Sequence, residues 1–320
     1  FDVSGAVVVR ANSDAYAQTD ASGGTGDAFG IQALLPKATA ATQTAAAVGS
    51  GVTLQADSLD IKATVDLRKA EATDNLIAIS LLAGGAGTSA DANVAGAVQA
   101  VLGGTATTIA VSGALDVVAE TANGTAVARA ELGGGGILNV QVALADASNT
   151  ASTQAWIADG TRITDAGSVN VKADSKDTAT ATSNVASGGL ISGRGTRADT
   201  TVTPSTQAWI GRDVRLDLRG SLRVDAIAQT AEGDASATAA GGGAIDVGVS
   251  LANIDIRPTA QAWIGGGGTR IDAGGNVAVN AELRQQQVGK QLDDNLAHSG
   301  VSIANDTISF TGHGLSTGDV

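Results

Sequence analysis

The sequence predicts an all-β protein built as a parallel β-solenoid, a stack of repeated extended segments. Three observations lead to this fold class: a phrase that recurs at a nearly fixed interval, an alternation of small apolar and polar residues, and a shortage of large side chains. A fixed interval of self-similarity is typical of a stacked array. It takes precedence over the one or two globular domains that 320 residues would otherwise suggest.

The recurring phrase reads Gln-Ala-Trp-Ile and contains all three tryptophans of the chain. They are Trp156, Trp209 and Trp263, and the two steps between them are 209 − 156 = 53 and 263 − 209 = 54. One unit earlier Val101 occupies the same position, so the position accepts other apolar residues. We predict that these four residues form a structural repeat slot that seals one corner of the coil. An exposed binding ladder of stacked tryptophans is the alternative.

A second phrase, small-Gly-x-aliphatic-x-aliphatic, follows each slot and gives an independent measure of the period. It starts six times, which corresponds to about five complete units of roughly 54 residues. Its first aliphatic residues are 52, 56, 54, 53 and 55 positions apart: Val7, Leu59, Leu115, Val169, Leu222 and Val277.

The residues within a unit alternate with a period of two. From Val169 to Val185 the odd positions are mostly small or apolar and the even ones polar, which indicates an extended strand with one buried face. The Thr, Val, Gly and Asn content opposes a helix. In two other units the alternation shifts by one residue, so a bulge or corner is expected near Asn123-Gly124 and near Gly233-Asp234.

The composition indicates a thin interior. The chain has 43 glycines and is only 2% aromatic, so it can bury its Ala, Val and Ile only between layers that lie close together. Glycine runs such as Gly133 to Gly136 are expected to permit this approach. We favour strands that continue in one rotational sense. A long antiparallel β-hairpin array is the alternative.

The expected architecture is a β-solenoid in which each unit of about 54 residues makes two coils of roughly 27 residues or three of roughly 18. With 12 to 18 coils stacked at about 4.8 Å, the rod would be on the order of 55 to 85 Å long. The array is expected over residues 1–288. Residues 289–320 carry no trace of the period and are read as a linker and the start of a second, truncated β module.

The net charge of −13 disfavours nucleic acid and anionic membranes as partners. No run of about 18 apolar residues predicts a membrane span, so no membrane insertion is expected. Cysteine is absent, which excludes disulfides and thiolate metal sites. Methionine is absent even at position 1, which indicates a segment of a longer or processed protein.

The glycine run, the aliphatic strand, Gln-Ala-Trp-Ile-Gly and the stretch Ile271 to Ala281 together resemble the repeats of large bacterial surface proteins of the filamentous-haemagglutinin and leukotoxin-like adhesin type. The resemblance covers about residues 1–285. It implies a right-handed parallel β-helix, an extracellular place on the bacterial surface, and attachment to host cells, other bacteria or abiotic surfaces. No receptor motif of the family is matched here.

Catalytic and metal sites are not expected. His298 and His313 are the only histidines, and neither has a second histidine or a cysteine with which to form a zinc site. Acidic and basic residues are interleaved, which is typical of a solvated strand face. These groups are Asp174 and Asp177 around Lys176, Asp66 near Arg68 and Lys69, and Asp213 between Arg212 and Arg215.

No cofactor is expected at two glycine-rich segments either. Gly23 to Asp27 is similar to the calcium nonapeptide, but its aspartate is one place early and no tandem copy follows. A sporadic calcium ion elsewhere on the acidic surface is the alternative. Gly265 to Gly268 lacks the lysine of a phosphate loop and is expected to be a turn.

The leading hypothesis is therefore a non-catalytic stalk or adhesive segment whose first partners are the adjoining modules of the same polypeptide. A β-helical carbohydrate-active enzyme and a lattice binder such as an ice binder are the alternatives. The lattice binder predicts Thr-x-Thr in successive strands, for which Thr178, Thr180 and Thr182 are the one indication.

Overall fold

The computed structural model describes residues 1–287, 301–302 and 307–308. Strands are its only regular elements, and no helix occurs among these residues. Eleven strands form one large sheet: β1 (Ala6–Leu34), β2 (Lys37–Val48), β4 (Ser58–Leu102), β6 (Ala114–Asn149), β7 (Ser152–Ile157), β9 (Ser168–Val202), β10 (Ser205–Ile210), β12 (Leu222–Gly242), β13 (Ile245–Ile256), β14 (Thr259–Ile264) and β16 (Val277–Gln287). Five short strands form a second sheet: β3 (Thr53–Ala56), β5 (Thr108–Val111), β8 (Arg162–Ala166), β11 (Arg215–Leu218) and β15 (Arg270–Ala273).

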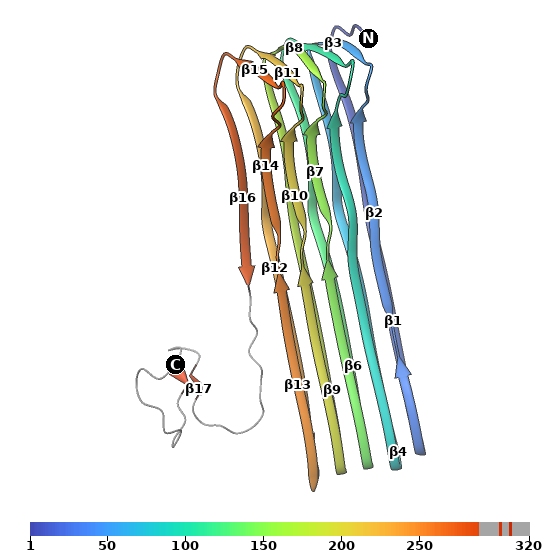
Figure 1. The fold of residues 1–320 in the computed structure, drawn as a ribbon. Helices are drawn as coiled ribbons and strands as arrows, with labels where there is room; N and C mark the ends of the chain where they lie inside the picture. The colour runs from blue at the N-terminus through green and yellow to red at the C-terminus, as the bar shows by residue number, and fades with distance from the viewer. Residues whose placement is uncertain (288–300, 303–306, 309–320) are drawn as a thin grey trace.

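The long strands run to one end of the molecule and return, so the large sheet has two walls (Figure 1). We call residues 58–80 of β4, and the residues paired with them, the outgoing wall. The return wall contains residues 83–102 and their partners, and the short strands form the end wall. One passage through the three walls is a rung. Rungs one to five begin in β1, β4, β6, β9 and β12, and β16 adds a sixth strand to the outgoing wall.

All strand pairs of both sheets are parallel, which confirms the expected all-β, parallel solenoid-like fold and contradicts the antiparallel hairpin array. Antiparallel pairing joins only β17 (Val301–Ser302) and β18 (Thr307–Ile308) among the described residues. These four residues are the described part of the predicted second module, and the rest of residues 289–320 lies outside the described residues.

The register links residues 52 to 56 positions apart in sequence. Leu59 pairs with Leu115 and Leu115 with Val169, and the shorter steps of a unit divided into two or three coils do not occur among the described strands. The expectation of narrow coils stacked into a long rod is therefore wrong. Six strands stacked about 4.8 Å apart span about 24 Å, whereas the 21 residues from 59 to 79 extend roughly 70 Å.

The interior changes in composition along its length. Near the end wall, where three walls enclose a wider space, buried Leu, Ile and Val residues such as Leu59, Leu102 and Ile109 outnumber the alanines. Farther away the two long walls face each other directly, and alanines such as Ala72 and Ala92 fill the gap. Small residues are needed there because two layers without a third wall pack well only at close range. This agrees with the thin interior expected from composition.

Glycine also permits the close approach at the far end. A Cβ atom on Gly134 would lie 2.0 Å from the carbonyl oxygen of Ala78 and 2.2 Å from the side-chain Nε2 of Gln141. A Cβ atom on Gly241 would lie 1.2 Å from Nη1 of Arg194. Glycine at these positions therefore leaves room for a neighbouring backbone or for a long polar side chain inside the solenoid.

One of the two predicted bulges is found where it was expected. The register between β6 and β9 shifts between Thr121 and Gly124, next to Asn123. In rung five the shift falls between Ala228 and Thr230, so the prediction at Gly233-Asp234 is wrong. Both residues of that pair are regular members of the ladder with β9.

Candidate functional site

The tryptophans form a continuous stack on the outer surface of the return wall. Trp156, Trp209 and Trp263 are paired in register in β7, β10 and β14, and Val101 at the end of β4 is the partner of Trp156. The ring centroids are 4.8 and 4.9 Å apart, with 2° between the ring planes in each pair. The structure thus brings all four predicted slot residues into one column.

Strand alternation explains which way these side chains point. Ala155 and Ile157 are fully buried in the core, so Trp156 between them projects outward. Trp156 and Trp209 are partly exposed, and Trp263 is 38% exposed. This outward position matches the alternative of an exposed ladder better than the expected corner seal. The apolar corner is filled instead by the inward-facing Ala and Ile of the same phrase.

A glutamine ladder runs beside the tryptophans and was not singled out by the sequence analysis. Its side-chain amides donate in one direction: Gln99 Nε2 to Gln154 Oε1, Gln154 Nε2 to Gln207 Oε1, and Gln207 Nε2 to Gln261 Oε1, each at 3.0 Å. The recurrence of Gln two residues before the slot is the signal that could have revealed it. We call the two columns together the Trp–Gln surface.

The Trp–Gln surface is a flat strip of aromatic rings flanked by amides. Parallel indoles offer edges and an exposed terminal face to apolar ligand surfaces, while the amides are already hydrogen-bonded to one another. Such a strip suits an extended, flat ligand rather than a small molecule enclosed in a pocket.

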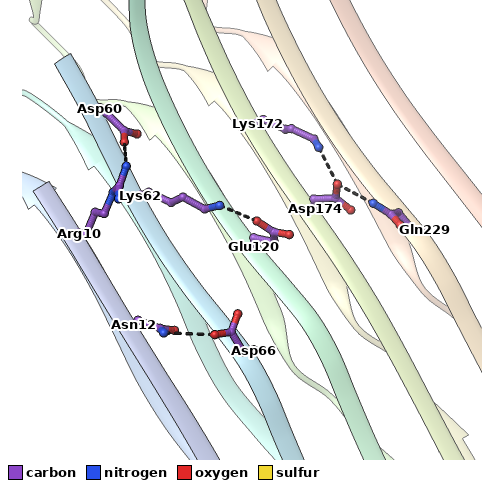
Figure 2. Close-up of polar contacts among 9 residues, drawn as sticks. All are labelled: Arg10, Asn12, Asp60, Lys62, Asp66, Glu120, Lys172, Asp174 and Gln229. Carbon is purple, nitrogen blue, oxygen red and sulfur yellow. Dashed lines mark hydrogen bonds and ion pairs between the residues drawn. The ribbon is translucent and has the colours of Figure 1, made fainter. Parts of the chain in front are cut away.

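Charged residues form a second set of ladders on the outgoing wall (Figure 2). Arg10 Nη2 lies 2.8 Å from Asp60 Oδ2 on the neighbouring strand, and Lys62 Nζ lies 3.0 Å from Glu120 Oε2. Asp174 Oδ2 forms an ion pair with Lys172 Nζ at 2.7 Å and accepts a hydrogen bond from Gln229 Nε2, also at 2.7 Å. The first two pairs are partly exposed and link neighbouring rungs, whereas Lys172 and Asp174 belong to the same strand and only Gln229 joins Asp174 to the next rung. Positive and negative charges are interleaved on this face, as expected. Each exposed pair adds about 0.2–1 kcal/mol.

The three acid–base groups named from the sequence do not converge. Asp66 stays on the surface, where it accepts a hydrogen bond from Asn12 Nδ2 at 3.2 Å (Figure 2), whereas Arg68 turns into the interior. Asp174 and Asp177 are also buried, so the expectation of a fully solvated face is wrong for these three residues. For Arg68 the cause is the bulge at Asp66 and Leu67, which moves the next residue to the inner face.

Two buried carboxyl groups have perturbed acidity. Burial raises the pKa of Asp177 to about 6, although hydrogen bonds from Ser175 and Asn149 and the charge of Arg68 act in the opposite direction. Asn149 Nδ2 donates to Asp177 Oδ1 at 3.1 Å. Burial likewise raises the pKa of Asp74 to about 6, against the hydrogen bond donated by the backbone of Glu131.

The same burial acts on Arg68. It lowers the pKa of the guanidinium group, and the nearby Asp177 raises it. Arg68 Nε donates to Thr42 Oγ1 at 3.1 Å. These groups lie inside the solenoid, so their perturbed acidity reflects the interior rather than an open catalytic cleft.

The remaining residues considered as metal or cofactor sites from the sequence form no such site among the described residues. Within the described ranges no group of three or more His, Cys, Asp and Glu residues is arranged to hold a metal ion. Gly23 to Gly26 belong to strand β1, and Gly267 and Gly268 have positive φ angles of 68° and 90° in the expected turn. His298 and His313 lie outside the described residues. No helix in the described part of the chain is long and apolar enough to span a membrane.

Comparison with known proteins identifies no relative. No protein-family model matches the sequence, no curated protein is significantly similar to it, and no solved structure matches the fold at a significant level.

Proposed function

We propose that this chain is a non-catalytic structural and adhesive segment, a stalk module of a long secreted or surface-attached bacterial protein. In this proposal the solenoid is a right-handed parallel β-helix in which each unit of about 54 residues makes one complete turn. The observation that carries it is the pairing of like residues in register, Trp with Trp and Gln with Gln, through successive rungs.

The geometry supports a mechanical role because every rung is bonded to the next by the same pattern. Backbone hydrogen bonds between parallel strands run along the stacking direction, so each strand is paired only with the strands of the neighbouring rungs. The natural partners of such a module are the adjoining modules of the same polypeptide. Its place would be the bacterial surface or the extracellular medium.

Single-molecule stretching along the stacking direction tests the stalk role. If one rung unfolds at a time, the contour length should grow in steps of about 190 Å, since about 54 residues each extend by roughly 3.5 Å. A single release of the whole chain, or steps of half that length, would contradict one rung per unit.

The Trp–Gln surface is the proposed contact site for the adhesive role. Adsorption to an insoluble polysaccharide, such as cellulose particles, measures it directly. Replacing all three tryptophans by valine should reduce adsorption at least tenfold while keeping the fold, because Val101 occupies the same column in rung two. Val101→Trp lengthens the ladder and should increase adsorption. Equal adsorption of all three proteins would remove the adhesive part of the proposal and leave the stalk.

The lattice-binding alternative has no specific support. A lattice binder needs Thr-x-Thr in successive rungs. Thr178 does have a threonine partner, Thr125 in β6, but Thr180 and Thr182 pair with Val127 and Arg129. The Thr-x-Thr pattern therefore does not continue into this neighbouring strand. The enzyme alternative needs three or more carboxylates that converge in a groove. The nearest arrangement is the column of Asp91, Asp146 and Asp199 on the outer face of the return wall.

A further inference from the structure

The half of the return wall farther from the end wall exposes apolar side chains where a solvated sheet would carry polar ones. In rung three the inward positions hold the buried polar residues Asn139 and Gln141. The alternate residues Val140 and Val142 point outward and are 51% and 42% exposed. The alternation is therefore inverted here with respect to the rest of the solenoid, which suggests that the outer face is itself covered.

The apolar side chains form ridges separated by glycine grooves. In one column Val140 of rung three lies between Gly85 of rung two and Gly193 of rung four, and rungs one and five carry Ile31 and Val247. The next outward column repeats the pattern with Ala33, Gly87, Val142, Gly195 and Val249. In these two columns rungs three and five are thus ridges, about 9.6 Å apart, and rungs two and four are grooves. In the neighbouring column, which holds Leu138 in rung three, rung four carries Ile191 instead of glycine.

The grooves end in polar residues near the middle of the wall. In the column beyond these two, rung two has Ser89 and rung four has Arg197, while Leu144 continues the ridge between them. Arg197 Nη2 forms an ion pair with Asp199, one column farther on. Polar residues therefore border the apolar patch on the side nearer the end wall, as they do at the rim of many protein–protein interfaces.

The exposed apolar area is large enough for a stable interface. The apolar side chains of rungs three to five together expose roughly 750 Å², compared with about 300–600 Å² for the largest patch of a typical monomer and about 800 Å² per partner in a stable complex. They are between 39% and 63% exposed and comprise Leu138, Val140, Val142, Leu144, Ile191, Ile245, Val247, Val249 and Leu251.

We propose that this corrugated patch binds the same patch of a second copy of the chain, and that the two form a face-to-face dimer. A twofold axis parallel to the strands and placed between rungs three and four brings the ridges of rungs three and five opposite grooves: rung three faces rung four of the partner, and rung five faces rung two. Rung one lies outside this contact, since the described return wall has five rungs. The arrangement is self-complementary, as a twofold interface requires. The sheets then pack at about 10 Å, as in other face-to-face sheet pairs.

Sedimentation equilibrium and light scattering of the purified chain test this dimer. The wild-type chain is expected to dimerise at micromolar concentration. Val140→Lys places a charge on the central ridge and should weaken the dimer at least a hundredfold, with an unchanged circular dichroism spectrum because the side chain points to solvent. A wild-type protein that remains monomeric at 100 times that concentration would overturn the proposal.

A groove-filling variant separates specific docking from general stickiness. A Cβ atom on Gly193 would meet only Val140 Cγ2, at 3.8 Å, so Gly193→Val should leave the monomer folded while it blocks the groove. We expect at least a tenfold weaker dimer, although the surface has become more apolar. Gly133→Val on the outgoing wall, where nothing lies within 4 Å of the added Cβ, is the control and should dimerise normally. Stronger association of Gly193→Val would contradict ridge-in-groove docking.

Discussion

Gly133 and Gly134 are neighbours in one glycine run, but only one of them is constrained by its surroundings. A Cβ atom on Gly134 would lie 2.0 Å from the backbone oxygen of Ala78, and backbone cannot give way cheaply. A Cβ atom on Gly133 meets nothing within 4 Å. The strand alternation that separates inward from outward positions decides the difference.

Gly134→Ala should therefore lower the free energy of unfolding by about 1–3 kcal/mol, the usual cost of overpacking a close interior. Gly133→Ala, its control, should change it by less than about 0.5 kcal/mol. Urea denaturation of both variants measures this difference. Equal losses in the two variants would contradict the inward position of Gly134.

The buried carboxyl group of Asp177 makes stability depend on pH. Its pKa is raised from 3.8 to about 6, so between these values the folded protein binds a proton that the unfolded chain has released. Stability contributed by this group is present below about pH 4 and is lost as the pH rises through about 6. The penalty at neutral pH is on the order of 3 kcal/mol.

Asp177→Asn should remove this penalty, because the amide carries no charge and its oxygen can still accept the bond from Asn149. The variant should be more stable than the wild type at pH 7, and the gap should close near pH 4. Thermal denaturation across this range measures the difference in stability. Because Asp74 is present in both proteins, its own titration does not contribute to that difference. A constant gap from pH 4 to 7 would show that Asp177 does not titrate in this window.

At the scale of the element, the tryptophan ladder couples three strands of the return wall. Trp209 stacks on both neighbours, at centroid distances of 4.8 and 4.9 Å, so its removal ends two contacts worth about 0.5–1.5 kcal/mol each. Trp209→Ala should destabilise the protein by about 2 kcal/mol. Trp209→Val should cost less because valine fits this column in rung two.

Near-ultraviolet circular dichroism gives a second measurement for the same variants. Parallel indoles at this distance couple electronically, and the coupled signal should disappear in both Trp209 variants because Trp156 and Trp263 are then two rungs apart. A signal that persists in Trp209→Val would contradict the stacked ladder. Trp263→Val, which leaves one stacked pair, should retain part of it.

Sequence reasoning predicts the strands well but locates their irregularities less well. The alternation around Val169 and the bulge beside Asn123 could be identified because one parity of residues is uniformly small. The bulge at Ala228 was misplaced because Gly233-Asp234 offered better turn chemistry than Gln229-Thr230. Local preference pointed to glycine, whereas the register with β9 decided the position.

For the Trp–Gln surface too, the sequence predicts one part of the arrangement but not another. The column of Trp156, Trp209 and Trp263 follows from the period alone. Its outward direction does not, because both Ala155 and Trp156 are apolar and either could face the core. Packing settles it: the inward space beside the end wall is filled by Ala and Ile, which leaves the larger indoles outside.

At the scale of the whole molecule, the period predicts stacking but not the shape of a rung. The repeat interval is compatible with one wide turn or with several narrow ones, since all keep the same side-chain alternation. The deciding property is the small volume of alanine and glycine, which allows two long walls to lie face to face without a third. The molecule is therefore a broad, thin stack (Figure 1) rather than a narrow rod.

The most direct test of the parallel, in-register stack is spin labelling of paired positions, which is simple because the chain has no cysteine. Labels at Asp116 and Asn170 occupy paired positions on neighbouring strands, about 5 Å apart along the stack, and should give strongly broadened spectra. Labels at Asp116 and Ser148, which are 32 positions apart in the sequence, lie on different walls and outside the apolar patch, so they should give sharp spectra. Broadening of the second pair without the first would contradict the account.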